Sequence, residues 1–299
     1  MPTIAVVAHA GKSFGGGLPE LREVLAREGF GQPLWYEVNK SRKAPKRVRR
    51  ALTAGADLIF VWGGDGMVQR CIDSLAGTEA VLAILPAGTA NLLATNLNVP
   101  ADLTEAVRVG LHGGRRRIDT GSLNGEHFAV MAGAGLDARM IKEADRRMKD
   151  KIGRLAYVYT GARNLSGRGM RAVIKVDGRP FFKGSLSCVL VANVGKVLGG
   201  IEIFGDARPD DGMLELGLVT ASNPAQWART LGRVVAGQPQ KSPFVHVTRG
   251  QRIRVQFNRK FGCELDGGAR KAVKKMRIRV HPGAIRISVP ADRYDLADD

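Results

Sequence analysis

A short glycine-rich segment that contains one aspartate is the part of the sequence best suited to chemistry. It reads Gly63-Gly64-Asp65-Gly66, follows an apolar run typical of a buried strand (Asp57–Trp62), and precedes a helical pattern. Glycines let backbone N–H groups approach a ligand closely, and the following helix N-terminus adds partial positive charge, so this loop suits a phosphate chain. The Asp65 carboxylate would repel phosphate, so it needs a separate role, either holding Mg²⁺ through water or accepting a proton from an attacking hydroxyl. The alternative is a tight strand-to-helix turn in which Asp65 is an N-cap.

A second loop of similar design follows about 22 residues later, where Pro86-Ala-Gly-Thr-Ala-Asn91 comes after the strand-like run Val81–Leu85. Gly88 allows close approach of the backbone, and the side chains of Thr89 and Asn91 can donate hydrogen bonds to phosphate or sugar oxygens. A capped helix would also explain this second pattern. In an open parallel sheet, however, ligands bind at the carboxyl ends of the strands. The two strand–loop–helix units together therefore predict a nucleotide site.

The elements that must position these loops alternate along the first third of the chain. This alternation predicts an α/β domain whose parallel strands are covered on both faces by helices. The expected strands are Ile4–Ala8, Leu34–Val38, Asp57–Trp62 and Val81–Leu85, and the expected helices are Leu18–Arg27, Ala44–Ala54, Met67–Ala76 and one that begins near Ala90.

From about Gly121 the pattern changes to strand-like segments separated by turn signals, which predicts an all-β-rich second domain. Its expected strands are His127–Met131, Met170–Val176, Ser185–Asn193, Met213–Val219, Arg252–Phe257 and Met276–Val280, with one long helix at Leu136–Asn164. The last apolar run, Ala284–Pro290, is expected to return to the first domain. We therefore expect a nucleotide-binding domain over residues 1–120 with 284–299, and a substrate-binding domain over residues 121–283.

The segments suited to chemistry resemble those of the bacterial diacylglycerol kinase-like lipid kinases, a family that shares its catalytic domain with sphingosine kinases and is distantly related to NAD kinases. Besides the two loops, the resemblance rests on three segments that occur in the family's order: Ala132-Gly-Ala-Gly-Leu-Asp137, Ala207-Arg-Pro-Asp-Asp-Gly212 and Leu265-Asp-Gly267. It covers roughly residues 1–290. It implies a nucleotide-binding α/β domain, a β-sandwich domain and an active site in the cleft between them, where the γ-phosphoryl group of ATP passes to a lipid hydroxyl.

The resemblance also implies roles for individual residues. Asp65 would be the key acid, bearing on the attacking hydroxyl or on Mg²⁺, and Asp211 would belong to an Asp-Gly element of the cleft. His9 lies on the first loop of the predicted nucleotide site, where Lys12 can reach a phosphate. The full set of predicted nucleotide-binding residues is His9, Lys12, Ser41, Gly63, Gly64, Asp65, Gly66, Gly88, Thr89 and Asn91.

The sequence departs from the family pattern at three places. Ala8-His9 stands where the first loop usually has Asn-Pro, and Met67 stands where a threonine usually follows the aspartate. The late Asp-Gly-Glu element, whose glutamate is a proposed general base in bacterial members, ends here in Gly268. Three readings remain open: Asp65, Glu264 or Asp266 serves as the base, or proton removal matters little in a loose transition state, or the chain binds nucleotide and transfers slowly.

Positive charge dominates the composition, because 46 Lys and Arg residues face 28 Asp and Glu residues and give a formal net charge of +18. Such a surface attracts polyanions, and we expect basic clusters to dock on an anionic membrane face. These clusters include residues 42–50, 115–117, 139–154 and 270–279. Nucleic acid is not expected as the main partner, because motifs and stacking aromatics typical of its recognition are missing from the sequence. The three cysteines are odd in number and form no Cys-x-x-Cys pair, which indicates reduced thiols in the cytoplasm.

The expected function is therefore that of an ATP- and Mg²⁺-dependent lipid kinase, a phosphotransferase with an alcohol acceptor. It would associate peripherally with the inner membrane face and convert diacylglycerol to phosphatidic acid. Two alternatives are kept: a kinase of the NAD kinase type with a soluble acceptor, and a catalytically weak sensor that binds nucleotide and lipid. The sequence also permits an oligomer.

Overall fold

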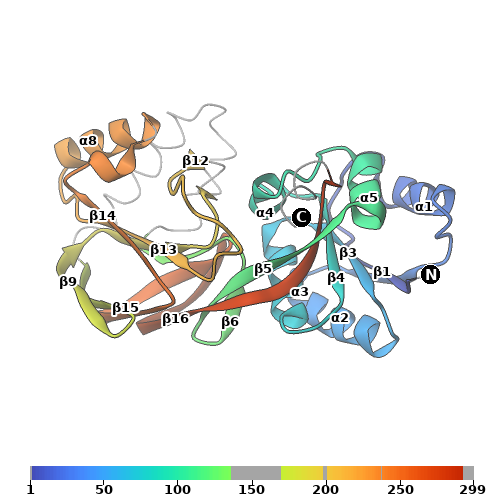
Figure 1. Ribbon diagram of the computed structural model, residues 1–299, viewed down its shortest axis with the longest axis horizontal. Helices are drawn as coiled ribbons and strands as arrows, with labels where there is room; N and C mark the ends of the chain where they lie inside the picture. The colour runs from blue at the N-terminus through green and yellow to red at the C-terminus, as the bar shows by residue number, and fades with distance from the viewer. Residues whose placement is uncertain (1, 136–169, 198–200, 237, 292–299) are drawn as a thin grey trace, which may run out of the picture. The chain divides into compact units, whose positions relative to one another are not determined.

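Two compact units make up the protein, a computed structural model of which describes residues 2–135, 170–197, 201–236 and 238–291 (Figure 1). The first unit comprises Met1–Asp119 and Gly283–Asp299, and the second comprises Thr120–Pro282. The expected helix Leu136–Asn164 lies outside the described residues. Strands β5 (Gly114–Leu123) and β16 (Gly268–Val289) each carry the chain from one unit into the other.

The first unit is built on a parallel sheet, as the alternation of its sequence predicts. The strand order is β16–β4–β3–β1–β2, and each neighbouring pair is parallel. Residues of β3 and β4 are buried throughout, as expected for strands covered on both faces. The last residues of β16 pair with the start of β4, so the predicted return of the C-terminal run to this sheet is observed. The other four strands are β1 (Ile4–His9), β2 (Leu34–Val38), β3 (Leu58–Gly63) and β4 (Val81–Pro86).

Helices cover both faces of this sheet (Figure 1). One layer holds α2 and α3, which pack on each other, and the opposite layer holds α1 and α5. The bounds are α1 (Gly17–Arg27), α2 (Ala44–Thr53), α3 (Asp65–Leu75), α4 (Leu92–Asn96), α5 (Leu103–His112) and the 3₁₀ helix η1 (Ser41–Lys43). Among the described residues, no helix is long and apolar enough to cross a membrane.

Helix α5 is absent from the predictions, although its start carries a recognisable signal. Asp102 is the N-cap and accepts a hydrogen bond from the backbone N–H of Glu105 at 2.9 Å. An aspartate followed three residues later by glutamate is a helix-start signature. Arg115 follows this helix and donates to the carbonyls of Gly110 and Leu111, so one of the predicted basic clusters is partly used to cap the C-terminus of α5.

The second unit consists mainly of antiparallel strands. The order β14–β13–β10–β7–β15–β16 forms one path, and β8 pairs with both β15 and β9. A predicted β-rich second domain is therefore confirmed. The bounds are β6 (Glu126–Phe128), β7 (Met131–Ala134), β8 (Met170–Val176), β9 (Arg179–Leu186), β10 (Cys188–Ala192), β11 (Lys196–Val197), β12 (Ile201–Glu202), β13 (Leu214–Val219), β14 (Val245–Gly250), β15 (Arg252–Leu265), α8 (Pro224–Val235) and the 3₁₀ helix η2 (Pro239–Lys241).

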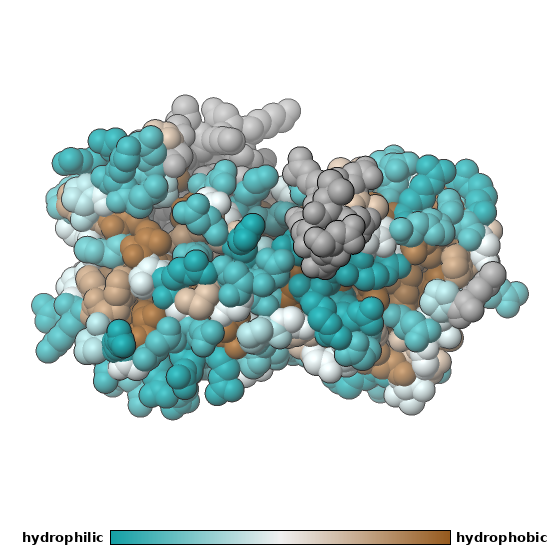
Figure 2. All heavy atoms as spheres, viewed as in Figure 1, coloured by the Kyte–Doolittle hydropathy of each residue, from teal (hydrophilic) through white to brown (hydrophobic). Residues whose placement is uncertain are grey.

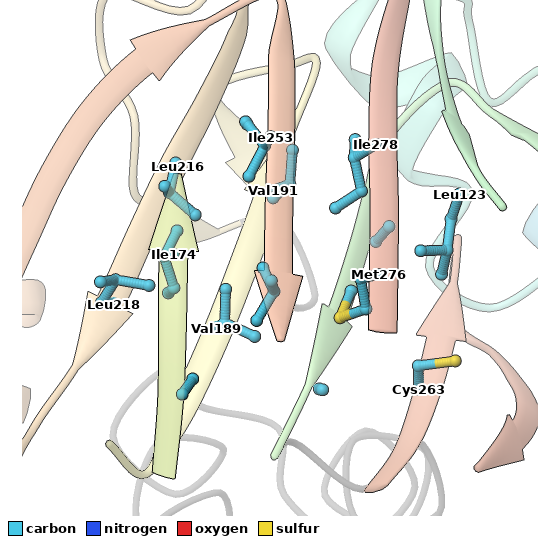
Figure 3. Packing of buried hydrophobic residues seen from close by; sticks show 14 of the residues in the cluster. Leu123, Ile174, Val189, Val191, Leu216, Leu218, Ile253, Cys263, Met276 and Ile278 are labelled. Atoms are coloured by element: carbon cyan, nitrogen blue, oxygen red, sulfur yellow. The ribbon is translucent and has the colours of Figure 1, made fainter. Parts of the chain in front are cut away.

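One apolar face of these strands forms the core of the second unit (Figure 3). Ile174, Ile253 and Ile278 come from β8, β15 and β16, and all three are almost fully buried against Val189 and Leu216. Residues on either side of these isoleucines are exposed, because successive side chains of a strand point to opposite faces. Strands β8, β15 and β16 therefore have one dry face and one wet face, whereas β7 and β10 are buried throughout.

Two predicted strands are interrupted in the structure, whereas Arg252–Phe257 and Met276–Val280 are parts of the longer strands β15 and β16. The run His127–Met131 is not continuous, because β6 ends at Phe128 and β7 begins at Met131. The amides between them donate to the carboxylate of Asp266 instead of to a neighbouring strand. Similarly, the run Ser185–Asn193 breaks at Ser187, because β9 pairs with β8 whereas β10 pairs with β7 and β13. Local patterns do not reveal such changes of partner.

Candidate active site

The two glycine loops lie side by side at the carboxyl edge of the parallel sheet. Strands β3 and β4 are neighbours, and Gly63 at the end of β3 pairs with Pro86 at the end of β4. Strand β1 lies on the other side of β3 and ends at His9. The three loops that follow these strands therefore emerge at one edge, which is where ligands bind in open α/β sheets.

Gly64 and Gly88 bring the two loops into backbone contact. A Cβ atom built on Gly88 would lie 2.4 Å from the Cα of Gly64, and one built on Gly64 would lie 3.0 Å from the Cα of Gly88. The first distance is shorter than real Cβ contacts and the second is tighter than most of them, so an alanine at Gly88 would force the two loops apart and one at Gly64 would crowd them. By contrast, a Cβ on Gly66 would meet nothing within 4 Å. The loops are closed against each other, whereas the space beside Gly66 is open.

The side chain of Asn91 fixes the shape of the second loop. Its Nδ2 donates to the carbonyls of Pro86 and Gly88 at 2.9 and 3.0 Å, and its Oδ1 accepts from the Gly88 amide at 2.9 Å. Its φ of 47° lies in the left-handed region that asparagine tolerates better than most residues. Both amide hydrogens are thus used within the loop, so Asn91 positions the loop backbone, and the neighbouring exposed Thr89 offers its hydroxyl.

Asp65 joins the two loops through its carboxylate. It is the first residue of α3, and its Oδ1 accepts a hydrogen bond from the backbone N–H of Leu92, the first residue of α4, at 2.6 Å. Burial raises the pKa of this carboxyl above its ordinary value, and hydrogen bonds from backbone amides at residues 91–93 oppose that rise. The N-cap of α3 itself is Gly64, so the suggested N-cap role of Asp65 within its own helix is not observed.

The loop after β1 is tied to β3 by a tryptophan that the sequence reasoning did not single out. Trp62 is fully buried, and its Nε1 donates to the carbonyl of Lys12 at 3.1 Å. The Lys12 side chain is exposed, and His9 is partly buried and accepts from the amide of Gly11 at 3.2 Å. A tryptophan at the end of an apolar run, directly before a glycine loop, is the signal that could have marked this anchor. Ser41 begins η1, which packs against α3.

The other predicted acidic residues belong to the second unit, where Asp266 has an evident structural role. It occupies a two-residue Asp-Gly turn between β15 and β16, with φ of 43° at Asp266 and 73° at Gly267. Positive φ at both positions is the mark of a type I′ hairpin turn. Its buried carboxylate accepts from the backbone amides of residues 129, 130 and 131 at 2.8–2.9 Å.

Glu264 and Asp211 occupy different surroundings from Asp266. Glu264 is 1% exposed and pairs with Gly133 of β7 across the sheet. Its negative charge contributes to a raised pKa at Cys188, for which burial of the thiol is the main cause. Asp211 lies on the turn before β13, where its carboxylate accepts from the Met213 amide at 3.0 Å and pairs with Arg249.

The position of Gly268, where the family pattern has glutamate, lies directly after the Asp266 turn. A Cβ there would be 2.7 Å from Nη1 of Arg270, so the guanidinium fills the space beside this glycine. Arg270 makes a two-pronged ion pair with Glu126, whose oxygens lie 2.8 and 3.0 Å from Nε. A carboxylate is therefore held near position 268, although it comes from β6 and is paired with an arginine.

The described residues contain no group of three or more His, Cys, Asp or Glu side chains that could hold a metal ion. A magnesium ion at a nucleotide is usually bound by one or two carboxylates together with substrate phosphates. Asp65 is the acidic side chain within the joined loops, so the residues fit a magnesium ion carried by phosphates with Asp65 as its protein ligand.

Comparison with known proteins matches both units to family models. Residues 6–123 match the diacylglycerol kinase catalytic domain, and residues 130–289 match the YegS C-terminal NAD kinase beta sandwich-like domain. Among curated relatives, "Probable lipid kinase YegS-like" of Pseudomonas aeruginosa (strain UCBPP-PA14) is 31% identical over 90% of this chain and 88% of its own. "Diacylglycerol kinase" of Bacillus subtilis (strain 168) is 28% identical over 81% of each chain.

Solved structures show the same fold. A diacylglycerol kinase from Bacillus anthracis (strain Sterne) superposes with a TM-score of 0.76 at 21% identity, covering 96% of each chain. An NAD kinase from Archaeoglobus fulgidus, solved in complex with ATP, has a TM-score of 0.54 at 14% identity and covers 97% of this chain and 95% of its own. On the family models and the 31% relative, the chain belongs to the family of diacylglycerol kinases and YegS-like lipid kinases, whose kinase activity implies phosphoryl transfer from ATP.

Proposed function

We propose that this protein transfers the γ-phosphoryl group of MgATP to the hydroxyl of a membrane lipid, and that diacylglycerol is the acceptor and phosphatidic acid the product. The observation that carries the proposal is the backbone contact between Gly64 and Gly88, which joins two glycine loops at neighbouring strand ends. Glycines at these positions let the two loops come close enough to present their amides together to one phosphate chain.

The first turn of α3 supplies the phosphate site in this proposal. The first amides of a helix have no partner within the helix and carry its partial positive charge. Gly66 lies in that turn, is exposed, and has open space where a side chain would be. We assign that space to the phosphates of ATP. Lys12, exposed on the loop after β1, would balance their charge.

Asp65 would serve the transfer through its charge and its position. Its Oδ1 is held by the Leu92 amide at 2.6 Å, so the carboxylate is oriented before any ligand arrives. Magnesium, when bound, would neutralise charge on the phosphates, with Asp65 as the protein ligand. The raised pKa of Asp65 also suits a group that takes up a proton from a hydroxyl, because a more basic carboxylate accepts protons more readily.

The choice of acceptor is supported by the relatives. Proteins named diacylglycerol kinase and YegS-like lipid kinase cover most of the chain, whereas the NAD kinase likeness concerns the fold alone. A lipid hydroxyl is therefore favoured over a soluble acceptor. Association with the membrane would be peripheral.

The test is phosphoryl transfer from γ-labelled ATP to diacylglycerol, monoacylglycerol, sphingosine, ceramide and phosphatidylinositol in anionic mixed micelles, with NAD as the soluble acceptor. We expect label in the organic phase with diacylglycerol, and a loss of that label in Asp65→Asn. Asp73→Asn is a matched control, because Asp73 lies two turns further along α3. Organic-phase label that survives in Asp65→Asn would overturn the role of Asp65, and label that appears only in NADP would replace the lipid with a soluble acceptor.

A further inference from the structure

Strand pairing gathers six basic side chains on the wet face of the second unit. Arg254 of β15 pairs directly with Arg277 of β16 on one side and with Lys175 of β8 on the other. Side chains that face each other across an antiparallel pair lie on the same face of the sheet. We call residues paired across the strands a row, so Lys175, Arg254 and Arg277 form the central row. The rows two residues to either side point to the same face and add Arg252 opposite Arg279, and Lys275 opposite Gln256. We call this set the basic face: Lys175, Arg252, Arg254, Lys275, Arg277 and Arg279.

The basic face is opposite the core, so all six side chains are exposed. Their neighbours in the sequence, Ile174, Ile253, Met276 and Ile278, are buried (Figure 3). Hydrophilic side chains also line the lower edge of this unit in Figure 2, where Figure 1 labels β6, β15 and β16. The alternation thus serves two purposes: every second residue builds the core, and the residues between them build a single charged surface.

The charges of the basic face are not balanced within the described part of the chain. None of its six members takes part in an ion pair there, although Arg117, Arg249 and Arg270 elsewhere do. Like charges directly opposite each other destabilise a sheet. The row Lys175–Arg254–Arg277 places three positive charges next to one another across three strands. Stability alone does not explain this arrangement.

The geometry suits an anionic bilayer better than a nucleic acid strand. The strands present their charges as parallel rows on a sheet surface. Val173 pairs with Gln256 in the row that also holds Lys275, and it is 40% exposed, among the most exposed large apolar residues of the described chain. An extended anionic surface can contact all rows at once. Bases need aromatic platforms for stacking, and the three rows contain no aromatic residue.

We propose that the basic face is the surface through which this protein docks on anionic phospholipid headgroups. The inference deepens the proposed function, because it names the partner surface from which the lipid acceptor would be taken. Binding would depend on the anionic lipid and would weaken as salt screens the charges. It needs neither ATP nor catalysis, so it can be tested separately from the kinase reaction.

The experiment is cosedimentation of the full chain with phosphatidylcholine vesicles that contain or lack phosphatidylglycerol, without ATP. The test variant combines Lys175→Gln, Arg254→Gln and Arg277→Gln, which neutralises the central row. The matched control combines Lys43→Gln, Lys46→Gln and Arg49→Gln, three exposed residues of η1 and α2 with the same total charge. Circular dichroism and a thermal melt establish that both variants are folded.

Each basic residue near an anionic surface strengthens binding roughly fivefold, so we expect the test variant to lose roughly 100-fold in partition coefficient on phosphatidylglycerol vesicles. The control variant should bind nearly as the unmodified protein does. Equal losses in the two variants would mean that net charge alone drives binding, and a larger loss in the control would move the docking surface to α2. Either result would overturn the proposal, as would unchanged binding by the test variant.

Two further readouts separate this proposal from its neighbours. With short-chain diacylglycerol in neutral detergent micelles, the folded test variant should keep its phosphoryl transfer. If neither the unmodified protein nor the test variant transfers phosphate there, the result counts against the proposed function and not against docking. Fluorescence anisotropy with labelled duplex DNA and single-stranded RNA tests the other polyanions. Tight binding to these that depends on the central row, with weak vesicle binding, would overturn the membrane assignment.

Discussion

Asp65 and Leu92 link the two glycine loops through one hydrogen bond, in which the Leu92 amide donates to the Asp65 carboxylate at 2.6 Å. The same carboxylate is largely buried, and burial raises its pKa. The fold thus holds this carboxylate in place although burial disfavours its charged form, and such groups are typical of functional sites. The proposed contact with magnesium or with the attacking hydroxyl would give the charge of Asp65 its function.

The raised pKa of Asp65 leads to a prediction about stability. The folded state binds a proton at this carboxyl more tightly than the unfolded chain does, so its stabilising effect is present below the unfolded pKa of about 3.9 and is lost as the pH rises through the folded pKa. At neutral pH the ionised Asp65 therefore lowers stability. Asp65→Asn keeps an oxygen for the Leu92 amide, so we expect an equal or higher melting temperature at neutral pH, together with a loss of about 100-fold or more in kinase activity. Calorimetry across acidic to neutral pH, with parallel assays, checks both.

Gly88 and Gly66 should respond in opposite ways to alanine. Gly88→Ala forces its Cβ to within 2.4 Å of the Gly64 Cα, and we expect about 1–3 kcal/mol of destabilisation and weaker ATP binding. Gly66→Ala has free space and lies in α3, so it should stabilise the fold by about 0.5–1 kcal/mol. If phosphates occupy that space, it should nevertheless weaken ATP binding. Thermal denaturation and titration calorimetry with ATP separate the two effects. Full ATP affinity in Gly66→Ala would show that the phosphates do not occupy the space beside Gly66.

Asp266 should be essential for folding of the second unit, whatever its part in chemistry. Asp266→Ala leaves the buried amides of residues 129–131 without their carboxylate, so we expect a loss of at least about 3 kcal/mol in the free energy of unfolding. Asp177 offers a matched control, because it occupies an Asp-Gly turn with φ values of 49° and 84° and its carboxylate also accepts from backbone amides, those of Gln251 and Arg252, but it is exposed. We expect Asp177→Ala to cost about 1 kcal/mol. Urea denaturation of both variants is the measurement, and similar losses would show that burial of the Asp266 carboxylate is not what matters.

Neutralising the central row of the basic face should not destabilise the protein. Lys175, Arg254 and Arg277 repel one another across the sheet, so replacing all three with glutamine should raise the free energy of unfolding by a few tenths to about 1 kcal/mol. The gain should shrink in high salt, where the repulsion is already screened. Urea denaturation at low and high salt provides the comparison. A stability loss at low salt would show that these side chains stabilise the sheet by packing.

Local sequence patterns were sufficient for the glycine loops of the first unit and for its elements up to the start of α4, whereas α5 was missed. Alternating apolar runs and helical periods predict β1 to β4 and the helices between them, because each pattern is complete within a few residues. The glycine loops are visible for the same reason, since Gly63–Gly66 and Pro86–Asn91 each follow a buried strand directly. The family resemblance of these segments is confirmed by the matches to both units.

Tertiary structure alone decided which distant residues meet. The Asp65 carboxylate reaches an amide 27 positions away, and the Asp266 carboxylate reaches amides 135–137 positions away. Strand register, set by packing of the apolar faces, places Arg254 between Lys175 and Arg277, although in the sequence they belong to separate runs. Pairing and register arise from contacts between segments far apart in the chain, so no local window contains them. The sequence therefore determines the candidate groups, and the fold determines which of them form a site, a turn or a surface.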